Sequence, residues 1–225
     1  MLARPRAVLW DFDGTLVDTE PIWARTEAEM LAAYGVTWDD EMMRSVIGQN
    51  AAVTVAQMAA SIGRPDLQAA LHEELHERIT SALLEDGLPF LPGAEEVLAA
   101  AVDDGVPAAV VTASHGFIMD RITHLLPDGV EFVISADDVT APKPDPEAYL
   151  LAMERLAVAP EDTLILEDSV PGTRAALDSG AFVFAVPALA RLEPHPRMVV
   201  SPDALRTTTW PDLLEVWREL SKVAC

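Results

Sequence analysis

Cysteine is nearly missing from this sequence, since Cys225 is the only one among 225 residues. One cysteine cannot form an intramolecular disulfide, and its position at the end of the sequence argues against a catalytic thiol. No apolar run reaches the roughly 18 residues that a membrane span requires. Arg4 and Arg6 flank an apolar run that is too short for a secretory signal. We therefore expect a protein of the reducing cytoplasm that makes no contact with a membrane.

Positive charge is also scarce. The sequence has 37 acidic and 15 basic residues, which gives a formal net charge of −22. Such a charge repels phosphate backbones, so we expect no nucleic-acid partner. It equally disfavours a small anionic substrate, unless the site supplies local positive charge, most simply a divalent cation and a well-placed lysine. We interpret most of the acidic residues as a solvated surface.

Apolar residues, by contrast, are abundant. They make up 50% of the sequence, which is enough for a sizeable core and argues against disorder. A chain of this length suits one large domain or two unequal domains. The sequence does not fix the oligomeric state, and a monomer is compatible with it.

From Glu20 to about Leu88 the sequence has the periodicity of helices. Pro21 suits a first helical turn, Gly35 suits a helix end, and further helical patterns cover 53–62 and 67–84. The residues predicted to form the apolar face of the first helix are Ile22, Trp23, Thr26, Met30, Leu31 and Tyr34.

After Gly93 the pattern changes to alternating helices and strands. The predicted helices are 94–102, 117–126, 146–156, 172–179 and 211–223. The predicted strands are 107–112, 132–135, 163–166, 181–186 and 198–200. This alternation indicates a parallel sheet covered on both faces, and the apolar run Ala7-Val8-Leu9 supplies its first strand. We therefore predict an α/β Rossmann-like core, residues 1–17 and 89–225, with an inserted helical cap, residues 18–88.

Two carboxylates follow the first predicted strand. Asp11 and Asp13 are two residues apart, so in extended chain they point to the same side, and Gly14 suits a tight turn. Such a pair can bind a hard cation, attack an electrophile and transfer a proton. An ordinary strand-to-helix turn rich in Asp and Gly is the alternative that the pair alone leaves open.

Polar residues also follow the other predicted strands, in a region where open parallel sheets bind their ligands. These residues are Thr112, Ser114, Lys143, Glu167 and Asp168. Each has an alternative interpretation as a helix cap, a solvated loop residue or a turn. Together they supply oxygen ligands for Mg²⁺, a lysine, and hydroxyls that can bind phosphate oxygens. A site for phosphoryl transfer needs these groups.

Four runs of residues resemble, in order and spacing, the four motifs of haloacid-dehalogenase-superfamily phosphatases. They are Asp11-Phe12-Asp13-Gly14-Thr15-Leu16-Val17-Asp18, Val110-Val111-Thr112-Ala113-Ser114, Lys143-Pro144-Asp145-Pro146, and Leu166-Glu167-Asp168-Ser169 with Pro171-Gly172 and Ala175-Ala176 after it. The sequence is similar to the subfamily I members with a helical cap, which include β-phosphoglucomutases and phosphoglycolate phosphatases. The resemblance spans nearly the whole chain and implies the same core and inserted cap that the periodicity predicts.

The resemblance also implies a role for each motif residue. It makes Asp11 the nucleophile that forms an aspartyl-phosphate and Asp13 the general acid and base. It places Mg²⁺ on the Asp11 carboxylate, the Asp13 backbone carbonyl and Asp168, with Glu167 in or near this shell. The residues that it assigns to the substrate phosphate are Thr112 and Lys143, assisted by Ser114 and the backbone around it.

The implied reaction is hydrolysis of a small phosphorylated metabolite, such as a sugar phosphate or phosphoglycolate. Asp13 argues against dehalogenases and phosphonoacetaldehyde hydrolases, which usually lack this second aspartate. The alternative interpretation as a sugar phosphomutase is weaker, because Trp23 stands where β-phosphoglucomutases typically carry a histidine. A non-catalytic binding protein on the same scaffold is the remaining alternative. Trp23, Gln49 and Asn50 are the candidates for substrate selection by the cap.

Overall fold

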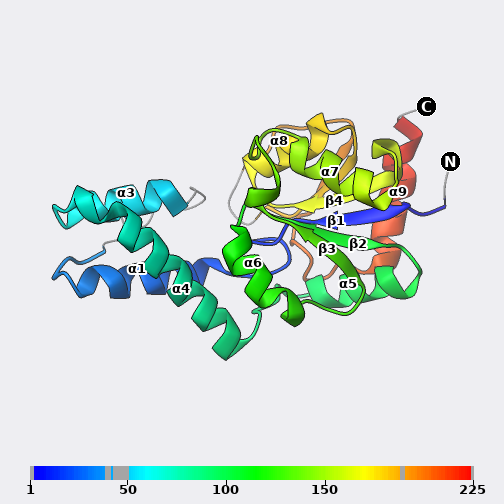
Figure 1. Ribbon diagram of the computed structural model, residues 1–225. Coiled ribbons are helices and arrows are strands. Elements are labelled where there is room, and N and C mark those ends of the chain that lie inside the picture. The colour runs from blue at the N-terminus through cyan, green and yellow to red at the C-terminus, as the bar shows by residue number, and fades with distance from the viewer. Residues whose placement is uncertain (1–2, 39–41, 43–50, 188–190, 224–225) are drawn as a thin grey trace.

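A six-stranded sheet forms the centre of the protein, as a computed structural model shows (Figure 1). The structure describes residues 3–38, 42, 51–187 and 191–223. All strand pairs are parallel, in the order β3-β2-β1-β4-β5-β6. The strands are β1 Ala7–Trp10, β2 Ala108–Val111, β3 Val130–Ile134, β4 Thr163–Glu167, β5 Phe182–Ala185 and β6 Met198–Val200. The predicted α/β Rossmann-like fold is confirmed.

Helices cover both faces of this sheet (Figure 1). The core helices are α5 Ala94–Asp103, α6 Gly116–Ile122, α7 Glu147–Leu156, α8 Val170–Asp178 and α9 Trp210–Val223. Alternate residues of β1 face opposite layers, because successive side chains of a strand point to opposite sides. Val8 and Trp10 pack in the cluster that contains α5 and α9, whereas Leu9 packs in the cluster that contains α7 and α8. Burial on both faces explains why β1, β2 and β5 are continuous apolar runs.

Between β1 and α5, the described part of the chain contains three α-helices that form a separate lobe, the cap (Figure 1). They are α1 Glu20–Ala32, α3 Ala51–Ser61 and α4 Gln68–Asp86. The two chain segments that lead into and out of the cap are hydrogen-bonded to each other. The Asp18 amide donates to the Pro89 carbonyl at 2.8 Å, and the Leu91 amide donates to the Leu16 carbonyl at 3.0 Å. These two hydrogen bonds lie close to the predicted boundaries of the cap, residues 18 and 88. The boundaries themselves stay a prediction.

The cap departs from the sequence prediction at the end of its first helix. Ile22, Thr26, Met30 and Leu31 are buried as predicted, but α1 ends at Ala32 and Tyr34 is 47% exposed. The assignment of Tyr34 to the apolar face was wrong, because the helix ends before Tyr34 and this residue lies in the turn that follows. Gly35, with a φ of 73°, lies in this turn.

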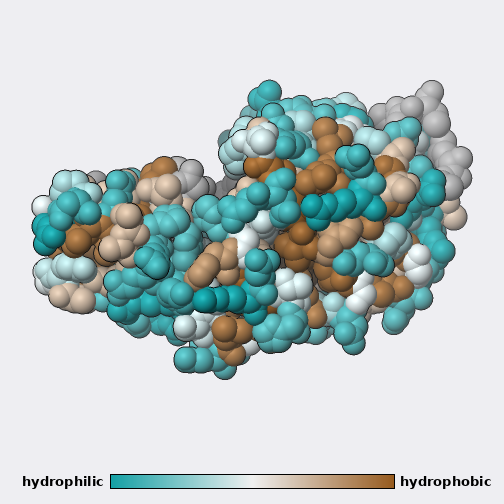
Figure 2. Space-filling view, viewed as in Figure 1, coloured by the Kyte–Doolittle hydropathy of each residue, from teal (hydrophilic) through white to brown (hydrophobic). Residues whose placement is uncertain are grey.

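The surface fits the predicted solvated character of the acidic residues. Figure 2 shows hydrophilic residues spread over the cap and its junction with the core, with smaller hydrophobic areas between them. Among the described residues, no helix combines the length and the apolar character needed to cross a membrane.

Candidate active site

The predicted site residues meet at one edge of the sheet. Asp11 directly follows β1, and its amide continues the strand pairing by donating to the Leu166 carbonyl of β4 at 3.0 Å. Thr112 follows β2 in the same way, with its amide 2.9 Å from the Ile134 carbonyl. Glu167 is the last residue of β4. Because the strands are parallel and in register, their carboxyl ends bring these side chains together.

Lys143 reaches this edge from the loop after β3, and its side chain is only 6% exposed. Its Nζ donates to Asp11 Oδ1 at 2.6 Å, to Glu167 Oε1 at 2.9 Å and to the Val111 carbonyl at 2.9 Å. An ammonium group has three protons, so these contacts use all of them. Burial alone lowers the pKa of Lys143, but the adjacent Asp11 and Glu167 carboxylates outweigh burial and raise it well above its ordinary value. Lys143 is therefore a fixed positive charge.

Glu167 is completely buried, and hydrogen bonds hold both of its oxygens. Oε1 accepts from Lys143 and from the Tyr149 hydroxyl at 3.3 Å, while Oε2 accepts from the Ser169 amide at 2.9 Å and hydroxyl at 3.0 Å. Gly172 in the first turn of α8 makes room for this carboxylate, because a Cβ there would lie 1.8 Å from Oε1. The most evident task of Glu167 is to hold Lys143 in position.

Excess negative charge gathers beside this lysine. Burial, followed by the charge of Glu167, raises the pKa of Asp11 well above its ordinary value, although Lys143 opposes the shift. The same two causes raise the pKa of Asp168 from 3.8 to about 7. One ammonium group thus balances only part of the charge of three carboxylates, and a cation bound here would favour their ionised forms.

The geometry of these carboxylates fits a divalent metal ion with oxygen ligands. Ligand oxygens of Asp11, Glu167 and Asp168 lie within 4.8 Å of one another. Gly14 packs against this group, since a Cβ on it would lie 2.4 Å from Asp168 Oδ2, and its φ of 85° also favours glycine. The Thr15 hydroxyl lies 3.4 Å from Asp168 Oδ1. The donors match the preference of Mg²⁺ for oxygen.

Asp13 lies beside the Asp11 group and is surrounded by hydroxyls. Its Oδ2 accepts hydrogen bonds from the Ser114 hydroxyl at 2.6 Å and the Thr112 hydroxyl at 3.2 Å. Its Oδ1 accepts from the Thr19 hydroxyl at 2.5 Å, and Thr19 immediately precedes α1 of the cap. Asp13 therefore connects the core motif with the base of the cap.

Sequence reasoning assigned no role to several residues that the site contains. Thr19 directly follows the motif run Asp11 to Asp18, so its position was a usable signal. Tyr149 gave none, because it lies on the buried face of the ordinary amphipathic helix α7, where its ring is 4.8 Å from Lys143 Nζ. Outside the carboxylate group, His115 directly precedes α6 and lies beside His72 and His76.

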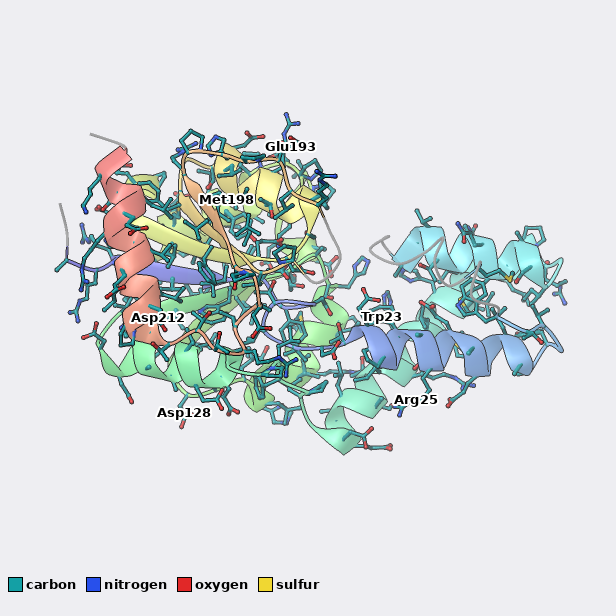
Figure 3. The ribbon with its side chains drawn as sticks, turned by 180° about the vertical axis from the view of Figure 1, so that it is seen from behind. Trp23, Arg25, Asp128, Glu193, Met198 and Asp212 are labelled. Carbon is teal, nitrogen blue, oxygen red and sulfur yellow. The ribbon has the colours of Figure 1, made fainter. Side chains whose placement is uncertain are left out.

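The cap candidates are only partly described. Trp23 is half-buried on α1, near the junction of cap and core (Figure 3), and its ring lies edge-on to His76 with centroids 6.1 Å apart. Gln49 and Asn50 lie outside the described residues. Substrate selection by these three residues stays a prediction.

Comparison with known proteins places most of the chain in one family. The family profile for haloacid dehalogenase-like hydrolases matches residues 8–186. The fructose-1-phosphate phosphatase YqaB of Escherichia coli is 32% identical over 185 residues, which are 80% of this chain and 95% of that protein. A phosphorylated carbohydrates phosphatase of Thermotoga maritima is 29% identical over 180 residues, 77% of this chain and 81% of that protein.

A solved structure shares the complete architecture. The crystal structure of CbbY from Rhodobacter sphaeroides in complex with phosphate superposes with a TM-score of 0.77 at 26% identity. The alignment covers 93% of this chain and 99% of that one, so it includes the cap as well as the sheet.

Proposed function

The chain belongs to the haloacid dehalogenase-like hydrolase family, and we propose that it is a Mg²⁺-dependent phosphatase of small phosphomonoesters. The observation that carries this proposal is the buried contact of Lys143 with Asp11 and Glu167 beside Asp168. A fixed ammonium group and a cluster of oxygen donors surround a carboxylate that can act as a nucleophile. The relatives whose names mention sugar phosphates support a sugar phosphate as the substrate type. Phosphoglycolate is the second substrate type that we propose to test.

In this proposal Asp11 is the nucleophile. The 2.6 Å contact with Lys143 fixes the orientation of its carboxylate. Attack by an Asp11 oxygen forms an aspartyl-phosphate as the bond between phosphorus and the leaving oxygen breaks. Lys143 also offers positive charge to the phosphoryl oxygens. We assign Thr112 and Ser114 to the same group, toward which their hydroxyls would turn from Asp13 when substrate binds.

Asp13 moves the protons of both steps. Its protonated carboxyl gives a proton to the leaving oxygen, and the resulting carboxylate then accepts a proton from the water that attacks the aspartyl-phosphate. The second step releases inorganic phosphate and regenerates Asp11. Hydrogen bonds from Thr112, Ser114 and Thr19 support this role, because they fix the position of the Asp13 carboxyl.

We assign the metal to the Asp11 carboxylate, the Asp13 backbone carbonyl and Asp168. When bound, Mg²⁺ supplies positive charge that offsets the charge developing on the transferring phosphoryl group. Glu167 adds negative charge at this site, but its hydrogen bonds to Lys143, Tyr149 and Ser169 favour a positioning role over direct ligation.

The cap chooses the substrate in this account, with Trp23, Gln49 and Asn50 as the residues to test. We propose that the enzyme acts on a small phosphorylated metabolite in the cytoplasm. A sugar phosphomutase on the same scaffold is distinguished by its product, because it returns a sugar phosphate isomer instead of inorganic phosphate.

A phosphoester panel with and without Mg²⁺ tests the proposal. We expect Mg²⁺-dependent release of phosphate, loss of turnover in Asp11→Asn, and loss of turnover with intact metal binding in Asp13→Ala. A Lys222→Gln variant, which changes an exposed lysine far along the chain in α9, is the control. The phosphatase assignment fails if β-glucose 1-phosphate with a bisphosphate activator yields glucose 6-phosphate faster than phosphate, or if no ester is hydrolysed.

A further inference from the structure

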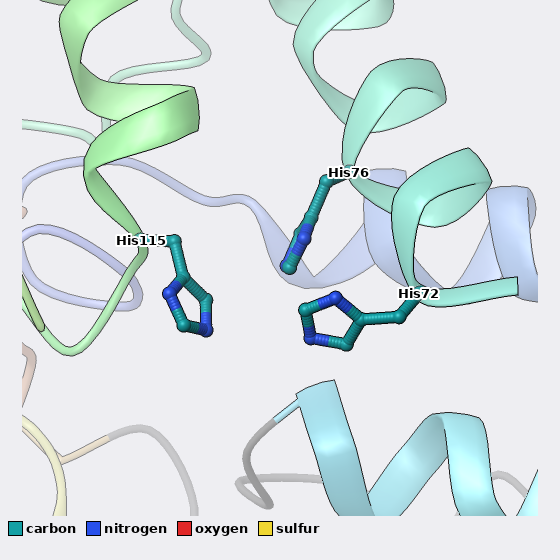
Figure 4. A group of neighbouring side chains, drawn as sticks. All are labelled: His72, His76 and His115. Atoms are coloured by element: carbon teal, nitrogen blue, oxygen red, sulfur yellow. The ribbon is translucent and has the colours of Figure 1, made fainter. Parts of the chain in front are cut away.

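Three histidines meet at the junction of the cap and the core, away from the carboxylate cluster. His72 and His76 are four residues apart on α4 of the cap, so both lie on one face of the helix. His115 directly precedes α6 of the core. Figure 4 shows the three rings turned toward a common volume. The ring centroids are 4.2 Å apart for His72 and His76, 5.1 Å for His76 and His115, and 5.6 Å for His72 and His115.

The neighbouring contacts prepare His115 to act as a ligand. Its Nδ1 lies 3.1 Å from Asp137 Oδ1, and the other oxygen of Asp137 accepts from the Gly116 amide at 2.9 Å. A carboxylate that holds one ring nitrogen fixes the orientation of the ring and leaves Nε2 available. This arrangement of carboxylate, histidine and free nitrogen is the one that metal-binding histidines use in proteins.

The surroundings of the two cap histidines favour their neutral forms. Burial, followed by the neighbouring His72 and His115 rings, lowers the pKa of His76 to about 4, and burial followed by His115 lowers the pKa of His72. Neutral imidazole is the form that coordinates a metal. Packing of the three rings without a ligand is the alternative, and the titration described below distinguishes the two.

The two elements that carry the histidines are held together by further contacts. Arg121 of α6 donates to Glu77 of α4 at 2.7 Å, one residue after His76 in the chain. The three imidazoles therefore come from two lobes that already meet at this point, and Trp23 of α1 packs edge-on against His76.

We propose that His72, His76 and His115 form a binding site for a divalent transition metal ion such as Zn²⁺. One nitrogen of each ring lies within 4.8 Å of the others. Small ring rotations bring them to the separation of about 3.3 Å that a tetrahedral site with Zn–N bonds of about 2.0–2.1 Å requires. Three nitrogen donors suit Zn²⁺, Ni²⁺ or Cu²⁺ and not Mg²⁺, and water completes the fourth position.

The ion would join the cap to the loop that carries Ser114. Two ligands come from the cap and one from the core, so binding stabilises the arrangement in which these lobes meet. Ser114, next to His115, donates to Asp13 at 2.6 Å. The ion thus connects α4 to the polar residues around Asp13, which gives the site a role in holding the cap and is separate from the Mg²⁺ chemistry at Asp11.

Calorimetric titration of the full-length, untagged protein with Zn²⁺ in excess Mg²⁺ tests this site without any need for turnover. We expect one Zn²⁺ per chain and a rise in the melting temperature. His72→Gln and His115→Gln should each weaken binding at least about tenfold, and Asp137→Asn should weaken it about tenfold through His115. His124→Gln, an exposed histidine outside the group, is the matched control and should bind as the native protein does.

The variants are chosen to keep the fold. His72 and His115 are only partly buried, and the melting temperature of each metal-free variant shows whether it is folded. Tetrahedral Co²⁺, observed by its visible absorption, gives a second readout that must disappear in the same variants. The proposal is overturned if the native protein binds no Zn²⁺, or if His72→Gln and His115→Gln bind it undiminished. Binding that is lost only in Asp168→Asn would likewise overturn it, because the ion would then occupy the carboxylates.

Discussion

At the scale of single residues, Lys143 and Glu167 show how the site stabilises two buried charged groups. A buried carboxylate and a buried ammonium group each lose favourable interactions with water, and only well-placed partners offset that loss. Glu167 accepts four hydrogen bonds and Lys143 donates three, so neither group is left without partners. The net charge of −22 over the whole chain makes this buried cation more important for binding an anionic substrate.

The space beside Glu167 gives a prediction about Gly172. Its backbone is ordinary helix, but a Cβ would lie 1.8 Å from Glu167 Oε1, so Gly172→Ala must displace the carboxylate. We expect a loss of roughly 1–3 kcal/mol in the free energy of unfolding, measured by denaturant titration, together with lower turnover because Lys143 loses a partner. Gly116→Ala is the control, since the nearest atom there is 3.1 Å away on exposed Asp137. Equal losses in both variants would contradict the account.

At the scale of elements, local sequence determined the positions of the inner strands but not the end of the first cap helix. The inner strands were predictable because both of their faces are buried, so β1, β2 and β5 are short apolar runs such as Ala108–Val111. The order of motifs along these strands also predicted the gathering of Asp11, Thr112 and Glu167 at one edge. The end of α1 was less predictable, because helix ends depend on a few turn residues, and Tyr34 was misplaced for that reason.

A buried carboxyl in the same helix gives a prediction about pH. Burial, followed by the charge of Glu20, raises the pKa of Glu27 from 4.5 to about 7. Between these values the folded protein holds a proton that the unfolded chain has lost, so this group makes the free energy of unfolding fall as pH rises through the window. Glu27→Gln removes the titration. We expect it to raise the melting temperature more at about pH 8 than at about pH 5.5.

The control for this experiment lies on the same helix. Glu29 is exposed, so Glu29→Gln should change the melting temperature little and by the same amount at both pH values. A difference between Glu27→Gln and the native protein that is independent of pH would show that the carboxyl is not protonated in this window.

At the scale of the whole molecule, the cap and the core meet through contacts between distant parts of the chain. The histidine group joins α4 to the residue before α6, and Arg121 pairs with Glu77 across the same junction. The helical spacing of His72 and His76 was visible in the sequence, but the approach of His115 depends on how the two lobes pack. No local pattern predicts such packing, which is why this group emerged only from the structure.

The overall charge gives a prediction about salt. With 37 acidic and 15 basic residues, the folded protein repels itself more strongly than the expanded chain does. Screening shortens the range of this repulsion from about 30 Å at 0.01 M salt to about 10 Å at 0.1 M. We expect the melting temperature to rise with NaCl over this range in the presence of a chelator. A melting temperature that stays constant or falls would show that local ion pairs outweigh the net charge.

The central claim is that Asp11 becomes covalently phosphorylated, and acid quenching during turnover tests it directly. Asp13→Asn should slow the breakdown of the intermediate, while p-nitrophenyl phosphate, whose leaving group needs no proton, still allows it to form. After quenching and reduction with borohydride, peptide mass spectrometry should find the modification at Asp11 when Mg²⁺ is present. The double variant that carries both Asp11→Asn and Asp13→Asn should show no modification. Turnover with an unmodified Asp11, or with the phosphoryl group on another residue, would contradict the account.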